Sequence, residues 1–197
     1  MYPNSLRDLI ESFKYLPSVG EKTAERFAFS IFGLDDDQFE FFKESLDNVR
    51  NKVHRCPRCN FLTEDELCSI CSDEFRDKNT LCVVEDVKNV FLFEKVGLFK
   101  GKYHVLDGLI SPLDGINPED IGIDKLLDRI NNENFNEIIF AFKPSIEGET
   151  TSLYIKKVLD GLDIKITKIA NGVPIGADIE YVDSLTLERA LSDRKEI

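Results

Sequence analysis

The feature that most constrains this chain is a pair of CxxC motifs, Cys56-Pro57-Arg58-Cys59 and Cys68-Ser69-Ile70-Cys71. Each motif places two thiolates on one tight turn, and two such turns can close around a single ion as a tetrahedral site of four sulfurs. Zn²⁺ is the ion that this geometry favours, and four protein ligands leave no open position for catalysis. We therefore expect Cys56, Cys59, Cys68 and Cys71 to hold one structural Zn²⁺ per chain.

Two other uses of such cysteines compete with zinc. A redox-active CxxC usually occurs singly near a βαβ unit, and paired disulfides are typical of secreted chains. Here the motif is doubled at a spacing typical of zinc sites, so zinc is the favoured interpretation. The fifth cysteine, Cys82, lies in the apolar run 81–84, and we expect it to be an inert core thiol.

Composition indicates an ordinary globular protein. The chain has 197 residues, of which 42% are hydrophobic and 31% are charged, so it is long enough for one or two domains with a proper core. Its first residues lead directly into an amphipathic pattern without a signal peptide, and no apolar run approaches the length of a membrane span. Together with the cysteine usage, this predicts a cytoplasmic protein in a reducing compartment.

The formal net charge of −12 argues against indiscriminate nucleic-acid binding along the whole surface. The charges are unevenly distributed, however. Four basic residues and no acid occur from position 50 to position 58, namely Arg50, Lys52, Arg55 and Arg58. Such a run is either a solvated helix face or a phosphate-contacting surface, and the sequence leaves both open.

The first 55 residues predict three helices. Ser5 and Asp8 resemble a capping box at the start of the first helix. A Pro17–Gly20 turn separates it from a second helix, expected from about Glu21 to Phe32 and ended by Gly33. The acids 35–37 supply a negative N-terminus for a third helix, which leads to the first cysteine.

After Cys71 the pattern changes. The polar segment 73–79 is interpreted as a linker, and strand-like and helix-like segments then alternate, which indicates βαβ units around a parallel sheet. The expected segments are 81–85, 86–94, 102–106, 123–131, 137–142, 149–162, 164–169 and 183–192. The Gly/Pro-containing connection 107–122 has no assignment.

The segment Leu16–Arg26 has the pattern of a helix-hairpin-helix. A short glycine turn presents backbone N–H groups at the start of the second helix, where an anion is favoured. Lys22 and Arg26 are four residues apart, so they share a helix face and could contact successive phosphates. In the alternative interpretation this is a simple αα-hairpin, in which Lys22 and Arg26 only pair with Glu21 or Glu25.

Acidic residues also follow two of the expected strands. Glu85 and Asp86 follow one, and Glu147 and Glu149 follow another. Acids at the carboxyl ends of parallel strands commonly mark a site. Glu85 and Asp86 could equally well cap the next helix. The Gly/Pro-rich loop 170–181 carries no arrangement of titratable or nucleophilic groups that suggests chemistry.

The order of hairpin, four-cysteine knuckle and α/β domain resembles the bacterial RecR family of recombination mediator proteins over essentially the whole chain. The stretches that carry this resemblance are Leu16–Arg26, Cys56–Cys71, Ile110–Ile116, Glu147–Glu149, Ile175–Tyr181 and Thr186–Leu191. The chain departs from the family at two positions, because Ser18 and Ala177 stand where glycine is common.

The resemblance implies an α+β multidomain fold. Its expected parts are a helical helix-hairpin-helix domain (1–55), a four-cysteine zinc finger (56–72), an α/β Toprim domain with a parallel sheet (80–175) and a C-terminal oligomerisation segment (176–197). Catalytic Toprim domains carry an Asp-x-Asp before the Glu-Gly-Glu, and Lys143 and Ser145 stand at those aspartate positions. A lysine there opposes a divalent cation, and Glu85 with Glu147 would be a poor Mg²⁺ cage. We therefore expect no enzymatic activity.

The resemblance further implies a role in recombinational DNA repair. Family members act with RecO and, in some bacteria, RecF to load RecA onto DNA coated by single-strand-binding protein, and they assemble as ring-like tetramers. DNA contacts are expected from Lys22, Arg26, Arg50, Lys52, Arg55 and Arg58, and RecO contacts from Glu147 and Glu149. Single-stranded, double-stranded and junction DNA remain open, as do a dimer and a tetramer. The alternatives are a metal-dependent Toprim nuclease or primase-like enzyme, and a zinc-stabilised scaffold that binds only protein.

Overall fold

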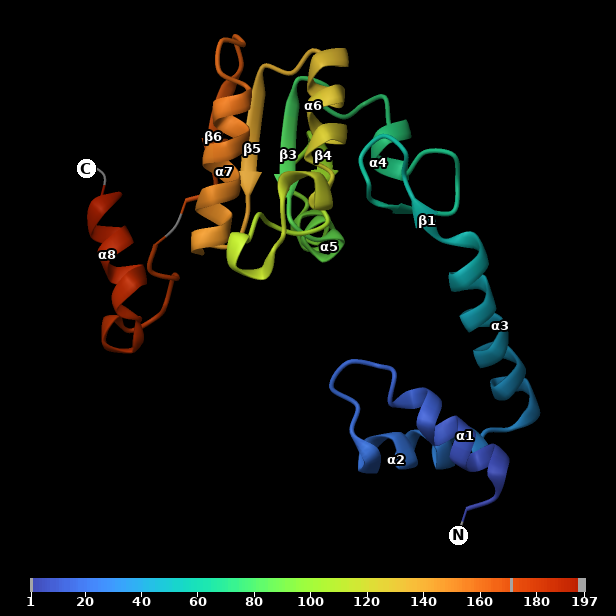
Figure 1. Ribbon diagram of the computed structural model, residues 1–197. Helices are drawn as coiled ribbons and strands as arrows, with labels where there is room; N and C mark the ends of the chain where they lie inside the picture. The colour runs from blue at the N-terminus through green and yellow to red at the C-terminus, as the bar shows by residue number, and fades with distance from the viewer. Residues whose placement is uncertain (1, 171, 195–197) are drawn as a thin grey trace. The chain divides into compact units, whose positions relative to one another are not determined.

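The structure is a computed structural model that describes residues 2–170 and 172–194. Its backbone divides into two compact units, Met1–Val53 and His54–Ile197 (Figure 1). Within the described residues, none of the helices combines the length and apolar character that spanning a bilayer requires.

The first unit consists of helices α1 (Asn4–Phe13), α2 (Glu21–Phe32) and α3 (Asp36–Lys52). Its buried core is small: Ile10 of α1 packs against Ala24 and Ala28 of α2, and larger side chains close around these three. The alanines let the two helices approach closely. Among the described side chains of α3, none is buried, and large apolar residues such as Phe41 and Val49 are exposed.

The predicted ends of α2 are confirmed, since the helix begins after Gly20 and ends before Gly33. The acidic start of α3 is also confirmed, because the Asp35 carboxylate accepts a hydrogen bond from the backbone N–H of Gln38 (2.8 Å). The predicted N-cap at Ser5 is wrong. The N-cap is Pro3, two residues earlier, and helix α1 begins at Asn4, because Pro3 sets φ to −54° and its carbonyl accepts the first helical hydrogen bond, from Arg7 (3.0 Å).

The second unit is built on a four-stranded sheet in the order β4-β3-β5-β6, and every neighbouring pair is parallel. The strands are β3 (Thr80–Val84), β4 (Lys102–Val105), β5 (Glu137–Ala141) and β6 (Lys165–Lys168). The connecting helices are α5 (Val87–Val96), α6 (Ile123–Asn132) and α7 (Ile146–Val158). The predicted α+β class and parallel sheet are therefore confirmed (Figure 1).

Both faces of the sheet are buried along β3 and β4 and most of β5, while the edge strand β6 is only partly covered, and alternation along β3 assigns its side chains to the two faces. Leu81 and Val83 of β3 join a core with α6 and α7. Cys82 and Val84 of the same strand join a second core with Val90 of α5 and with the four-cysteine segment. Strands covered on both faces are typical of parallel sheets.

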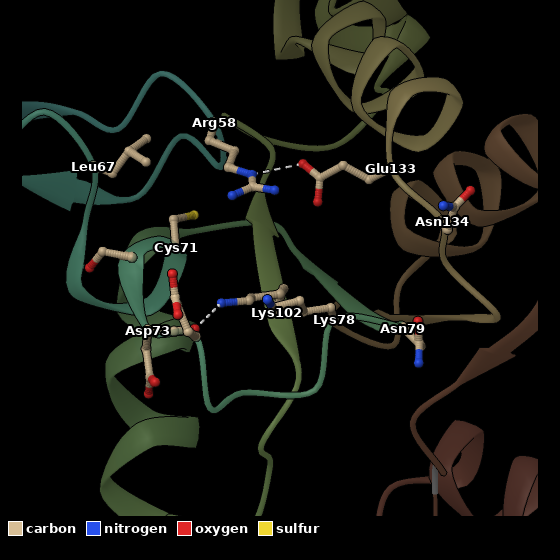
Figure 2. Close-up of a pocket in the computed structure, with 11 residues that line it drawn as sticks. Arg58, Leu67, Cys71, Asp73, Lys78, Asn79, Lys102, Glu133 and Asn134 are labelled. Carbon is tan, nitrogen blue, oxygen red and sulfur yellow. Dashed lines mark hydrogen bonds and ion pairs between the residues drawn. The ribbon is translucent and has the colours of Figure 1, made fainter.

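The four-cysteine segment lies on the second face. It comprises β1 (His54–Arg55), β2 (Leu62–Thr63) and the short helix α4 (Ser69–Ser72), and we call it the knuckle. Beside it opens a hollow of about 580 Å³ (Figure 2). Its lining comes from the knuckle, the linker that follows it, the start of β4 and the end of α6.

The unassigned connection 107–122 is ordered by short-range structure. It contains the 3-10 helices η1 (Pro112–Asp114) and η2 (Pro118–Ile121) and an antiparallel bridge between Ser111 and Ile116. The buried Thr151 hydroxyl of α7 accepts from the N–H of Ile110 (2.9 Å), which attaches the loop to the sheet's helical layer. After β6 the chain continues into η3 (Ile179–Tyr181) and α8 (Ser184–Ser192).

Candidate metal centre and nucleic-acid interface

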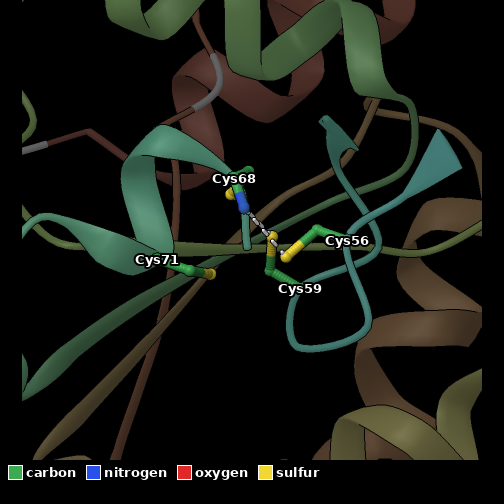
Figure 3. A group of neighbouring side chains, drawn as sticks. All are labelled: Cys56, Cys59, Cys68 and Cys71. Atoms are coloured by element: carbon green, nitrogen blue, oxygen red, sulfur yellow. Dashed lines mark hydrogen bonds between the residues drawn. The ribbon is translucent and has the colours of Figure 1, made fainter. Parts of the chain in front are cut away.

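The first two cysteines lie on a tight turn between β1 and β2. These strands pair antiparallel, and the N–H of Cys56 donates to the carbonyl of Phe61 (2.6 Å). Asn60, directly after Cys59, adopts a φ of 62°, a left-handed conformation that asparagine tolerates better than most residues. Cys68 precedes α4 and Cys71 lies within it, so a helical turn presents the second pair (Figure 3).

The sulfur positions fit one tetrahedral ion. All four cysteines are buried, and their Sγ atoms lie within 4.8 Å of one another. A zinc–sulfur distance of about 2.3 Å requires sulfurs roughly 3.8 Å apart in a tetrahedron. Among the described residues, this is the one group of three or more His, Cys, Asp or Glu side chains whose ligand atoms lie close enough to hold a metal.

Two of the thiols, those of Cys59 and Cys68, also interact directly with each other. Hydrogen bonding with the Cys68 sulfur, 3.4 Å away, raises the pKa of Cys59, and burial raises it further. The same hydrogen bond lowers the pKa of Cys68. Four buried thiolates would repel one another, whereas a soft divalent cation would accept all four and release their protons. The donor set therefore suits Zn²⁺.

The knuckle is anchored to the sheet by backbone and side-chain bonds. The carbonyl of Cys59 accepts from the N–H of Val105 at the end of β4 (2.9 Å), and the Asn60 side chain donates to the Val105 carbonyl (2.9 Å). Cys82 lies in the same core, where burial raises its pKa to about 12. This confirms Cys82 as a buried core thiol, and it makes the metal centre part of the sheet's packing.

Lys102 is a buried residue that supports the knuckle, and the sequence alone did not identify it. It is the first residue of β4, its side chain is 4% exposed, and it lines the hollow beside the knuckle. Its ammonium donates to the carbonyl of Ile70 (2.7 Å) and to that of Asp73 (2.7 Å), at either end of the stretch that contains Cys71. Figure 2 shows the second of these bonds. Burial lowers the pKa of Lys102, although the neighbouring Cys71 opposes that shift.

The two knuckle arginines form internal ion pairs. Arg55 contacts the Asp107 carboxylate (2.8 Å), and Arg58 donates through Nε to Glu133 at the end of α6 (2.8 Å; Figure 2). Arg129 donates to the same Glu133 oxygen (3.0 Å). Burial alone would raise the pKa of Glu133, but the two guanidinium groups hold it below its ordinary value. Much of the positive charge at these arginines is therefore neutralised within the unit.

The turn between α1 and α2 has the geometry of an anion site. Ser18 adopts a φ of 65°, so a serine holds the left-handed conformation for which glycine is better suited. Gly20 is the N-cap of α2 and offers no side-chain acceptor. The first N–H groups of α2, at Glu21 and Lys22, have no acceptor within the helix and are available to an anion.

Lys22 and Arg26 are exposed on α2, and their acidic neighbours are engaged elsewhere. Glu21 forms an ion pair with Lys14 (2.9 Å), and Glu25 accepts a hydrogen bond from the Tyr2 hydroxyl (3.2 Å). In the part of the chain that the structure describes, neither Lys22 nor Arg26 forms an ion pair. The alternative in which they only pair with Glu21 or Glu25 is therefore not what the structure contains.

The remaining members of the basic run lie at the end of α3. Arg50 and Lys52 are exposed in its last turn, where positive charge complements the helix dipole. The run therefore changes environment along its length. Its first part is helical and exposed, and its second part belongs to the knuckle and is ion-paired.

At the carboxyl edge of the sheet, helix caps occupy most of the polar groups. The Asp86 carboxylate accepts from the N–H of Lys88 (2.8 Å) in a capping box, so the capping alternative for Asp86 is confirmed. The Ser145 hydroxyl caps α7, accepting from the N–H of Gly148 (3.2 Å). A Cβ at Gly148 would collide with the Lys143 carbonyl, so the close approach of α7 to this loop requires glycine.

The other three acids of this edge, Glu85, Glu147 and Glu149, differ in the partners that they contact. Glu85 accepts from the backbone N–H of Lys143 (3.1 Å). Glu149 forms an ion pair with Lys168 (3.0 Å) and approaches Arg189 of α8 (3.8 Å). Hydrogen bonding with Ser145 lowers the pKa of Glu147, and no ion pair within the described residues involves that carboxylate.

Comparison with known families identifies the chain. Its segments match, in order, the models of the RecR helix-hairpin-helix (6–50), the RecR four-cysteine zinc finger domain (53–73), the Toprim domain (79–170) and the RecR C-terminal region (172–195). Recombination protein RecR of Natranaerobius thermophilus is 45% identical over 196 residues, covering 100% of this chain and 98% of that protein. Recombination protein RecR of Staphylococcus aureus strain Newman is 43% identical over 196 residues, covering 100% and 99%.

This chain belongs to the RecR family.

Family membership assigns a name to each part already described. The α1–α2 turn lies in the RecR helix-hairpin-helix, the knuckle is the RecR four-cysteine zinc finger, and the parallel sheet forms the Toprim domain. The predicted zinc cofactor is thereby confirmed in the family assignment and in the cysteine geometry. The RecR family is one of recombination proteins, so the chain has a role in recombinational repair.

Proposed function

We propose that this RecR-family chain is a non-enzymatic, DNA-binding mediator of recombination. It acts with RecO and, in some bacteria, RecF to load RecA onto DNA coated by single-strand-binding protein. The observation that carries the proposal is the pair Lys22 and Arg26 beside the start of α2, with Glu21 and Glu25 engaged by other partners. Two cations without an ion-pair partner among the described residues, together with the first N–H groups of α2, suit successive phosphates.

The six basic residues contribute unequally in this proposal. Lys22 and Arg26 make the main phosphate contacts, and Arg50 and Lys52 add contacts from the last turn of α3. Arg55 and Arg58 contribute least, because each must first exchange a carboxylate at 2.8 Å for a phosphate.

Assembly compensates for the small number of contacts. Two or three phosphates neutralised per chain give weak binding that is easily lost in salt, and the net charge of −12 opposes binding elsewhere. A dimer or ring-like tetramer repeats the same basic patch, so that several weak contacts act together. The exposed apolar side chains of α3, such as Phe41 (74% exposed) and Val49 (64%), support burial of that helix against a second copy.

The Toprim edge supports a non-catalytic role. Mg²⁺ prefers oxygen ligands in near-octahedral geometry, and Lys143 brings an ammonium to this edge instead of a carboxylate. Ser145 is used as a helix cap, and Glu85 already accepts from a backbone N–H. On this basis Mg²⁺ or Mn²⁺ should support neither cleavage nor extension of DNA. A nuclease or primase-like activity abolished by Glu85→Ala would favour the enzyme alternative.

Glu147 is the carboxylate that we propose contacts RecO. Unlike Glu149, which is paired with Lys168, Glu147 has its charge available to a basic partner surface. Glu147→Lys should weaken RecO binding while zinc content and assembly stay unchanged. Unaltered RecO affinity would reject this contact and leave the DNA proposal standing.

The central test compares two double variants that remove positive charge. The hairpin pair is Lys22→Gln with Arg26→Gln, and the knuckle pair is Arg55→Gln with Arg58→Gln. DNA affinity is measured over a salt series, with oligomer mass on the same samples. We expect the hairpin pair to lower affinity roughly tenfold or more and to flatten the salt slope by about 1.4 per engaged chain on single strands. The knuckle pair should mainly lower thermal stability. An equal loss of DNA affinity in both double variants would show that Arg55 and Arg58, although ion-paired, bind phosphate as well as Lys22 and Arg26 do.

A further inference from the structure

Tyr15 is an aromatic side chain held in solvent within the turn between α1 and α2. It is 86% exposed, and its neighbour Leu16 is 51% exposed. Among the described residues, the Tyr15 ring has no aromatic contact and its hydroxyl has no hydrogen-bond partner. The ring is therefore not used for packing the hairpin.

The backbone that carries this ring is fixed. The N–H of Tyr15 donates to Ser12 (3.2 Å), and the N–H of Leu16 donates to Phe13 (3.1 Å). Phe13 in turn packs edge-on against Phe27 of α2, with ring centroids 5.6 Å apart. An exposed ring on a fixed backbone loses little conformational entropy on binding a ligand.

Tyr15 lies beside the phosphate-binding end of α2. The ion pair between Lys14 and Glu21 (2.9 Å) joins the residue before Tyr15 to the residue before Lys22. The Lys14 ammonium also pairs with Glu11 (3.0 Å), so this cation is shared by two carboxylates. The hairpin thus presents an exposed ring at its turn, followed along the chain by Lys22 and Arg26, which form no ion pair among the described residues.

A ligand that complements both features needs a free π-face and regularly spaced negative charge. We propose that Tyr15 stacks on an unpaired DNA base while Lys22 and Arg26 hold the adjacent phosphates, which makes single-stranded DNA the preferred ligand of the hairpin. In a duplex the bases already stack on one another, so only the phosphates are accessible to the turn. The proposal rests on the DNA-binding function proposed above and names the form of DNA that this site takes.

Stacking also gives this acidic chain a DNA contact that does not depend on positive charge. Base–aromatic stacking contributes about 1–3 kcal/mol per base and involves no counterion release, so it persists where salt weakens phosphate contacts. A chain of net charge −12 would in this way retain single strands at salt concentrations that remove duplex DNA.

The first experiment measures the affinity of Tyr15→Ala and Tyr15→Phe for an oligothymidylate and for a duplex of equal length, across a salt series. We expect Tyr15→Ala to weaken single-strand binding by about 5- to 150-fold, with the salt slope unchanged. Duplex affinity should stay within about twofold, and Tyr15→Phe should bind as the parent does because phenylalanine keeps the ring.

The second experiment uses the absence of tryptophan from the sequence. Tyr15→Trp introduces a single tryptophan, whose emission should be quenched by the oligothymidylate and much less by the duplex. Phe32→Trp is the matched control, since Phe32 is 83% exposed at the opposite end of α2. Its emission should not respond to either DNA.

Each outcome separates stacking from the underlying DNA proposal. If Tyr15→Ala leaves single-strand affinity unchanged, or lowers single-strand and duplex affinity equally, stacking is overturned. If it weakens RecO binding instead, the ring is a protein contact and the proposal is likewise overturned. The double variant Lys22→Gln with Arg26→Gln tests the hairpin itself, because full DNA affinity there would remove the site on which stacking depends.

Discussion

The helical unit and the zinc-finger–Toprim unit use their basic residues in opposite ways. On α2, Lys22 and Arg26 are exposed and form no ion pair within the described residues. Around the sheet, by contrast, Lys102 is buried against backbone carbonyls and Arg58 is paired with Glu133. The charges of Lys22 and Arg26 are therefore available to a ligand, whereas those of Lys102 and Arg58 hold the fold of the second unit together. A basic residue is therefore a binding group only when its own neighbours leave it uncompensated.

The two units also differ in how much core supports them. The described core of the helical unit contains three buried residues, Ile10, Ala24 and Ala28, while the sheet is buried on both faces. The helical unit should therefore depend more on association with other chains, and the second unit on its metal. Substitutions in each unit test this difference.

The largest effect is expected from removing a metal ligand. Cys59→Ser should abolish zinc binding and destabilise the second unit by more than about 5 kcal/mol, because the binding energy of a structural zinc is folding energy. The measurements are metal analysis and thermal unfolding.

Cys82→Ala is the matched control for this ligand substitution. Cys82 is buried in the same core but is not a ligand, so the substitution should cost about 1 kcal/mol and keep one zinc per chain. Hydrogen exchange of the α2 amides should not change in Cys59→Ser. Loss of α2 protection in that variant would show that the two units do not unfold independently.

A smaller effect is expected from the buried lysine. Lys102→Met removes the donor from the carbonyls of Ile70 and Asp73 and should lower stability by about 2 kcal/mol, with faster zinc loss to a chelator. Lys100→Met, two residues earlier and exposed, should stay within about 0.5 kcal/mol. Equal stability of the two variants would mean that Lys102 does not support the knuckle.

His104 should give a pH-dependent effect of about 1 kcal/mol. Burial and the nearby Arg129 and Lys125 lower the pKa of His104 from 6.5 to about 3. Because the folded-state pKa lies below the unfolded value, the unfolded chain binds the extra proton. The corresponding stability is present above pH 6.5 and is lost as the pH falls toward the folded pKa.

The measurement compares unfolding of the parent and His104→Leu at pH 7 and pH 5.5, in excess zinc. The parent should lose about 1 kcal/mol more than the variant between these two pH values. An equal loss in both proteins would mean that His104 is protonated in the folded state.

The smallest effect is expected at the hairpin turn. Ser18→Gly should stabilise the helical unit by about 0.5 kcal/mol. Glycine adopts the left-handed conformation (φ 65°) without the steric cost that serine bears, and the larger entropy of glycine in the unfolded chain offsets part of this gain. Ser30→Gly, inside α2, should destabilise the unit by about as much. Thermal unfolding measures both, and a stabilisation of the same sign in both would point to an effect other than backbone conformation.

Several features of this protein could be predicted from the sequence because their signals are local. The four ligands follow from the doubled CxxC, and the ends of α2 follow from Gly20 and Gly33. Each predicted strand lies within one residue or two of the observed one, since β-branched runs and turn residues act over a few positions. Lys22 and Arg26 share a face simply because they are four residues apart on a helix.

Tertiary structure alone determined which charged side chains are available to a ligand. Arg58 is paired with a carboxylate 75 residues away, and Glu85 accepts from a backbone N–H 58 residues away. Alternation in Lys102-Tyr103-His104-Val105 is typical of a strand with one solvated face, yet all four residues are buried because helices and the knuckle cover both faces of the sheet. Ion pairing and burial depend on distances between segments that only packing brings together. A residue's type therefore follows from the sequence, but its charge state and its availability to a ligand follow from the neighbours that the fold supplies.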